Sequence, residues 1–107
     1  MNAIAGGALF GFKTARQPRT LAAASYVNLG QLFQLGNGVP KDYAQGRQWY
    51  EKAAAGGRTF AMVQLGDFYR LGLGVPRDLA QARKWYEAAA AAGDAAGSKA
   101  LDGMKRR

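Results

Sequence analysis

Residues 29–50 read LGQLFQLGNGVPKDYAQGRQWY, and residues 65–86 read LGDFYRLGLGVPRDLAQARKWY. Each landmark of the first segment recurs 36 residues later, as Leu29 does at Leu65 and Trp49 at Trp85. When residues 25–60 are aligned with residues 61–96, 19 of the 36 positions are identical. Self-similarity at a fixed period of this length is typical of stacked repeats. The sequence therefore predicts an array built from one duplicated structural unit.

The first half of each repeat has the apolar period of a helix. Ala61, Leu65 and Tyr69 are spaced i, i+4 and i+8, and Leu29 and Phe33 repeat the pattern in the first copy. Residues with this spacing lie along one helical face.

A glycine interrupts both of these predicted helices at the same place, Gly30 and Gly66. Glycine inside a helix costs about 1 kcal/mol relative to alanine. Its presence in both copies indicates a steric requirement, and we expect a neighbouring helix to approach closely there.

A compact turn follows each first helix. Its residues are two glycines, a proline and an aspartate, found at Gly36, Gly38, Pro40 and Asp42 and again at Gly72, Gly74, Pro76 and Asp78. Glycine suits the left-handed conformation just past a helix end, and proline prevents the helix from continuing. Aspartate is a preferred N-cap, so we expect both aspartates to begin the second helix rather than to act as catalytic carboxylates.

The second helix of each pair carries small and aromatic residues at helical spacing. In the second copy these are Ala82, Trp85, Tyr86 and Ala89, and the first copy matches them with Gly46, Trp49, Tyr50 and Ala53. The two tryptophans could act as stacking platforms for a ligand, but a stripe of this kind is what paired helices bury, which favours core packing.

The ends of the chain differ from the repeats. Residues 1–19 match neither copy, and Pro18 and Thr20 indicate a helix start. We predict a leader at 1–19 that caps the first helix through Ile4, Leu9, Phe10 and Phe12 or forms a tail, with a repeat domain at 20–105. That domain comprises repeats at 25–60 and 61–96 and a partial third at 97–105. We expect Asp94 to cap the closing helix.

The net charge of +8 is concentrated at the two ends of the chain. Residues 20–104 carry nine basic and seven acidic side chains, so the remaining excess lies in the leader and in the last three residues. Specific nucleic-acid binding usually needs a basic stripe on a folded face. Binding of nucleic acid or anionic surfaces through the basic termini is therefore the alternative function, and not the preferred one.

The repeat resembles that of the Sel1-like repeat proteins, relatives of the tetratricopeptide repeats. The matching positions in the second copy are Ala61, Leu65, Gly66, Tyr69, Gly72, Gly74, Val75, Asp78, Ala82, Trp85, Tyr86, Ala89, Ala90 and Gly93. The first copy departs at Ser25, Phe33 and Gly46. The resemblance implies an all-α, right-handed solenoid of antiparallel helix pairs that serves as an adaptor or scaffold for other proteins.

The residue inventory argues against an enzyme. The chain has no histidine and no cysteine, and its only serines are Ser25 and Ser98. A serine–base–acid constellation or a histidine metal site cannot be assembled from these residues. The glycine loops lack the GxxxxGK[ST] pattern of a phosphate-binding loop. We therefore predict neither catalysis nor a cofactor.

Stacked helix pairs present their first helices on a common concave surface. On that surface we predict contacts to a peptide or helix of a partner protein from five residues: Asn28, Gln31, Gln64, Asp67 and Arg70. Arrays usually need about three repeats, because each unit buries its apolar face only against its neighbours. Self-association through an end face, or covering by the leader, would compensate for the short array.

Overall fold

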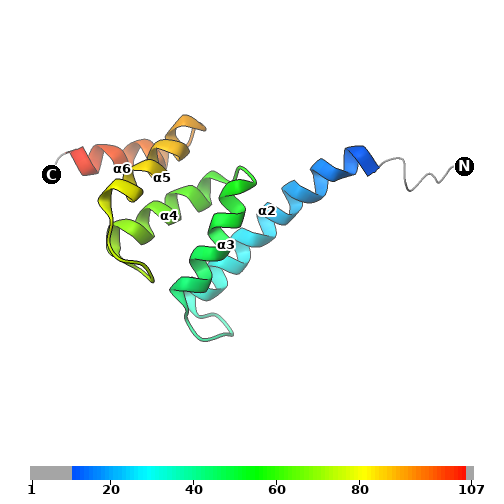
Figure 1. The fold of residues 1–107 in the computed structure, drawn as a ribbon, viewed down its shortest axis with the longest axis horizontal. Helices are drawn as coiled ribbons and strands as arrows, with labels where there is room; N and C mark the ends of the chain where they lie inside the picture. Colours follow the sequence, from blue (N-terminus) through cyan, green and yellow to red (C-terminus); the bar gives the residue numbers. More distant parts are fainter. Residues whose placement is uncertain (1–10, 106–107) are drawn as a thin grey trace, which may run out of the picture.

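The computed structural model describes residues 11–105 and shows five helices there (Figure 1). Helices α2 (Gly11–Leu35) and α3 (Tyr43–Ala55) form one antiparallel pair, and α4 (Thr59–Leu71) and α5 (Leu79–Ala91) form the next. Helix α6 (Ala95–Lys105) packs on α5. The arrangement is elongated, 62 × 33 × 18 Å, and it confirms the predicted all-α repeat solenoid. In this part of the chain no helix has the length and hydropathy needed to cross a bilayer.

The turns between paired helices have the predicted chemistry. Gly72 has φ +72° and ends α4, and Gly36 has φ +73° at the equivalent place after α2. The backbone N–H of Asp42 donates to Phe33 O at 2.9 Å, and that of Asp78 donates to Tyr69 O at 2.8 Å. Both turns are thus closed by the same hydrogen bond to the preceding helix.

An aspartate caps α3, α5 and α6, whereas α4 begins after Arg58, whose side chain makes no capping hydrogen bond. Asp42 Oδ1 accepts from Gln45 N at 3.1 Å, and Asp78 Oδ1 accepts from Ala80 N and Gln81 N. Asp94 Oδ1 accepts from Ala96 N at 2.9 Å at the start of α6. The carboxylates therefore satisfy N–H groups that have no partner within the helix, which is the capping role predicted from the sequence.

The start of the first helix differs from the prediction. Pro18 and Thr20 indicate a helix start, but α2 begins at Gly11 and runs through Pro18 without a break. Proline fixes φ at a value that a helix tolerates, so its cost inside a helix is one lost hydrogen bond and a local clash. The expected boundary is therefore wrong.

The second half of the predicted leader belongs to this helix. Residues 11–19 continue α2 and extend beyond α3 at one end of the molecule, so this part of the leader does not fold back over the first helix (Figure 1). Ile4, Leu9 and Phe10 lie outside the described residues, as does the side chain of Phe12, so their predicted capping contacts stay a prediction.

The core lies between the two helix pairs. Its buried residues are three alanines, two aromatic residues and a leucine from α3 and α4: Tyr50, Ala53, Ala54, Ala61, Leu65 and Phe68. The Tyr50 and Phe68 rings meet edge to face, with centroids 5.6 Å apart, a geometry that favours aromatic pairs. Because these residues belong to neighbouring pairs, the core exists only when the repeats stack.

The tyrosines, rather than the tryptophans, are the fully buried aromatic residues of the second helices. Tyr50 and Tyr86 have no exposed surface, whereas Trp49 and Trp85 are half-buried. Trp85 packs against the core, and Trp49 stacks on the Tyr26 ring at 5.5 Å.

Candidate functional site

The five predicted contact residues lie on the first helices of the two pairs. Asn28 and Gln31 belong to α2, while Gln64, Asp67 and Arg70 belong to α4. Asn28 is exposed and the other four are half-buried. The structure connects three of the five to a polar network that includes residues the sequence reading did not select.

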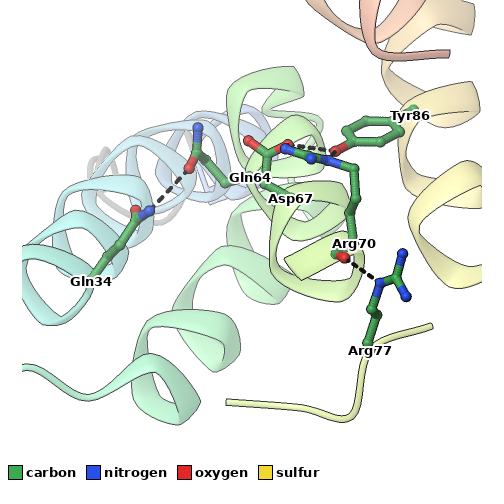
Figure 2. A network of polar contacts seen from close by, with 6 residues as sticks. All are labelled: Gln34, Gln64, Asp67, Arg70, Arg77 and Tyr86. Carbon is green, nitrogen blue, oxygen red and sulfur yellow. Dashed lines mark hydrogen bonds and ion pairs between the residues drawn. The ribbon is translucent and has the colours of Figure 1, made fainter. Parts of the chain in front are cut away.

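Gln64 is joined to the preceding repeat through Gln34. Gln34 Nε2 donates to Gln64 Oε1 at 3.3 Å, so a side-chain hydrogen bond links α2 to α4 (Figure 2). On its other side, Gln34 Oε1 accepts from the Tyr50 hydroxyl at 2.6 Å. Gln34 was missed by the sequence reading, although its repeat equivalent, Arg70, was selected.

Asp67, Arg70 and Tyr86 form a charged version of the same arrangement in the second repeat. The Tyr86 hydroxyl donates to Asp67 Oδ1 at 2.5 Å and accepts from Arg70 Nε at 3.0 Å, as Figure 2 shows. Arg70 Nη2 lies 3.5 Å from Asp67 Oδ1. The side chains of Asp67 and Arg70 are 33% and 35% exposed, so the pair borders solvent and remains accessible to a ligand.

Burial and hydrogen bonding shift the protonation equilibria of this network. Burial, followed by the hydrogen bond to Asp67, raises the pKa of Tyr86 to about 12. Burial raises the pKa of Tyr50 to about 12 as well. The hydrogen bond to Tyr86 is the main cause that raises the pKa of Arg70. Both tyrosines therefore stay neutral near pH 7 and act as hydrogen-bonding groups.

A glycine makes room for each of these tyrosine rings. A Cβ on Gly66 would come within 2.6 Å of Tyr86 Cδ1, and a Cβ on Gly30 would come equally close to the Tyr50 ring. The expected close approach at these glycines is therefore made by an aromatic ring from the paired helix. The glycine thus lets the tyrosine ring pack directly against the first helix of the pair. The tyrosine hydroxyl then reaches polar side chains of that same helix.

A cavity of about 280 Å³ opens beside the charged network, between α4, α5 and α6. Its lining combines charged, polar and apolar side chains: Asp67, Arg70, Leu79, Arg83, Tyr86, Ala100, Gly103 and Met104. A concave, largely apolar site with a few charged groups is typical of a binding pocket. The sequence could have suggested it only through the charged pair at Asp67 and Arg70, because the apolar lining comes from three separate helices.

The arrangement can bind but shows no reactive constellation. The Asp67 carboxylate, the neutral Tyr86 hydroxyl and the Arg70 guanidinium contact one another, and the Arg83 side chain lines the cavity beside them. Within residues 11–105, no group of three or more His, Cys, Asp or Glu side chains is placed to hold a metal ion. The chemistry on offer is therefore hydrogen bonding, ion pairing and apolar contact.

Comparison with known proteins identifies the repeat. The family model described as Sel1 repeat matches residues 23–57 and 59–94, close to the two copies recognised in the sequence. No curated protein gives a significant match.

Two solved structures resemble the chain over 70% of its length. One is a Sel1 repeat protein from Oxalobacter formigenes, with 40% sequence identity and a TM-score of 0.67. The other, with 41% identity and a TM-score of 0.68, is a protective antigen present in uropathogenic Escherichia coli strains and displaying an SLR fold. The present chain spans only 31% of the first protein and 16% of the second. Since the family model covers most of the sequence in two adjacent copies, the chain belongs to the Sel1 repeat family.

Proposed function

We propose that this chain is a protein-binding module that holds a peptide or helix of a partner protein against the face formed by α2, α4 and α6. The observation that carries this proposal is the polar row along that face. Gln34, Gln64, Asp67 and Arg70 follow one another from α2 to α4 and end at the cavity beside α6.

Family membership supports a binding role. Sel1 repeat proteins generally mediate protein–protein interactions, and their repeats form scaffolds rather than catalytic centres. Solenoid repeats use extended surfaces for recognition because each unit contributes a similar patch. We therefore assign no reaction to the chain and treat its polar row as a recognition surface.

The polar row is suited to contact with a polypeptide backbone. Glutamine side chains both donate and accept hydrogen bonds, and arginine donates several in a fixed geometry. Half-buried groups of this kind are partly desolvated already, so a ligand displaces less water from them. Asn28 and Gln31 extend the row on α2 toward the start of the array.

Site-directed photo-crosslinking tests which face makes the contact. A photoreactive amino acid is placed at Asn28 on α2 or, as the matched control, at Gln48 on α3; both positions are exposed and belong to the same repeat. Gln64 on α4, which is half-buried, and Lys84 on α5, which is exposed, are the equivalent positions in the second repeat. After irradiation in a lysate of the native host, we expect protein adducts from the α2 and α4 positions and few from α3 and α5. Adducts confined to α3 and α5 would overturn the proposal.

A further inference from the structure

The cavity has a counterpart in the first repeat that is filled. Each lining residue has an equivalent 36 positions earlier, and the equivalents of Leu79, Ala100 and Met104 are Tyr43, Gln64 and Phe68. In the first interface, the Tyr43 and Phe68 rings meet edge to face with centroids 5.8 Å apart. Phe68 is fully buried there. In the second interface, the smaller Leu79 is 40% exposed and Met104 is half-buried.

The polar bridge of the first interface is also missing from the second. Gln64 accepts a hydrogen bond from Gln34 across the two repeats. At the equivalent place, Arg70 faces a repeat in which Ala100 replaces the glutamine, and alanine has no side-chain acceptor. The second interface therefore lacks both an aromatic ring and an acceptor that the first interface contains.

The charged residues around the cavity indicate which kind of ligand group it favours. Two arginines, Arg70 and Arg83, line the cavity, and Asp67 is the acidic residue among its lining side chains. The Asp67 carboxylate is already engaged by Tyr86 and Arg70 (Figure 2). An arginine offers more N–H donors than its contacts with Tyr86 and Asp67 use. The cavity is therefore complementary to an anionic group.

The volume fits one large side chain. A protein cavity of about 150 Å³ lined by apolar residues is enough to bind benzene. The cavity here measures about 280 Å³, which accommodates an aromatic ring together with a carboxylate beside it. Leu79 and Met104 provide apolar contact for the ring at the positions where Tyr43 and Phe68 contact each other.

We propose that the cavity between α4, α5 and α6 binds an aromatic side chain from an acidic segment of a partner protein, with a neighbouring carboxylate paired to Arg70. In the first interface, the chain itself provides an aromatic ring, Phe68, and a hydrogen-bond acceptor, Gln64. In the second interface, the bound segment provides both. This inference rests on the proposed protein-binding function and specifies the chemistry of the ligand.

The repeat comparison also provides the variants that test the proposal. Ala100→Gln combined with Met104→Phe gives α6 the two side chains that Gln64 and Phe68 supply from α4 in the first interface, and so fills the cavity from within. Arg70→Gln removes one of the two arginines that line the cavity. It also copies Gln34, which accepts a hydrogen bond from the Tyr50 hydroxyl in the first repeat. Lys84→Gln is the matched control, because it removes one positive charge on the exposed side of α5 and also copies its repeat equivalent, Gln48.

The probe is a phage-displayed library of random internal peptides about a dozen residues long, selected on the purified full chain. We expect enrichment of peptides that carry Phe, Tyr or Trp within one helical turn of Asp or Glu. An enriched peptide, synthesised and measured by fluorescence anisotropy, should bind the filled variant and Arg70→Gln about tenfold more weakly, the size expected for one charge-assisted hydrogen bond. Lys84→Gln should change its Kd by less than about twofold, since exposed charges contribute little.

The melting temperature separates loss of the site from loss of the fold. Because filling a cavity commonly stabilises a protein, the filled variant should melt at or above the temperature of the parent chain while it loses the peptide. If enriched peptides bind the filled variant as tightly as the parent, the cavity inference is overturned and the crosslinking result still decides the broader function. Enrichment of basic or non-aromatic peptides, or a dimer of the parent chain that only the filled variant abolishes, would also overturn it.

Discussion

At the scale of single residues, the repeat is organised around the contact between a glycine and a tyrosine. Gly66 leaves the space into which the Tyr86 ring fits, and the ring carries its hydroxyl to Asp67 and Arg70. Gly30 and Tyr50 do the same one repeat earlier, where the hydroxyl reaches Gln34. The residue with no side chain therefore determines where the buried polar group lies.

This contact makes a sharp prediction for alanine substitution. Gly66→Ala should destabilise the chain by about 1–3 kcal/mol, because overpacking against the Tyr86 ring outweighs the gain in helix propensity. The control is Gly103→Ala in α6, where an added Cβ has no neighbour within 4 Å. That change should stabilise by about 0.5–1 kcal/mol, since only propensity is altered. Urea unfolding followed by circular dichroism measures both, and equal effects at the two sites would contradict the argument.

At the scale of secondary-structure elements, the boundaries between helices are fixed by local chemistry that is repeated. Asp42, Asp78 and Asp94 each cap the helix that follows them, and glycine in the left-handed conformation follows α2 and α4. The second turn also touches the first repeat, because a Cβ on Gly74 would lie 2.8 Å from Tyr43 Cβ at the start of α3. A turn in one repeat is thus part of the packing surface of the previous one.

The N-caps can be tested one at a time. Asp78→Ala should cost about 1 kcal/mol, because the carboxylate accepts from two backbone N–H groups at the start of α5. Asp102→Ala is the control, since Asp102 is an exposed residue near the end of α6 and removing an acid there should be neutral or slightly favourable. Thermal unfolding of the two variants gives the comparison. A cost at Asp102 as large as that at Asp78 would refute the capping role.

At the scale of the whole molecule, stability comes from stacking one pair on the next. The core joins α3 to α4, and α6 packs on α5. A Cβ on Gly97 of α6 would be 2.7 Å from Tyr86 O, so the two helices approach closely at this point. Because the buried tyrosines sit within these stacked pairs, their ionisation reports on the whole array.

Alkaline pH should therefore unfold the chain. Tyr50 and Tyr86 have pKa values of about 12 in the folded state, above the ordinary tyrosine value of about 10. Their contribution to stability is fully present below about pH 10 and is lost as the pH rises toward 12, because the unfolded chain releases its protons first. Urea titrations between about pH 9 and 12 should show this fall. The double variant Tyr50→Phe/Tyr86→Phe should show a shallower fall, and an equally steep one would remove the tyrosines as its cause.

The projecting start of α2 gives a second prediction at this scale. Deleting residues 2–16 should reduce the helical signal but leave the melting temperature within about 2 °C of the parent, since this part of α2 extends beyond α3 in Figure 1. Light scattering on the same samples reports the oligomeric state. A fall of more than about 5 °C, or a change in molecular mass, would instead show that residues before 17 cover an end of the array.

The repeat, its period and most helix boundaries could be predicted from the sequence alone. These features follow from local rules, because a glycine past a helix end, a proline and an N-capping aspartate act on residues within a few positions of themselves. The same local reasoning was wrong at Pro18, where the helix continues through a residue that usually marks a start. Family membership also followed from the sequence, since it depends on many fixed positions rather than on any one contact.

The polar contacts between helices and the position of the cavity could not be predicted from the sequence, because both depend on tertiary packing. Gln34 joins the network because it lies between Tyr50 and Gln64, which are 16 and 30 residues away in the chain. The cavity exists because Leu79 and Met104 are smaller than the rings that pack together at Tyr43 and Phe68. The periodicity of the sequence reveals what the repeats share. A cavity between repeats arises instead from the few positions where they differ. Its volume depends on side chains from three helices, which the sequence does not bring together.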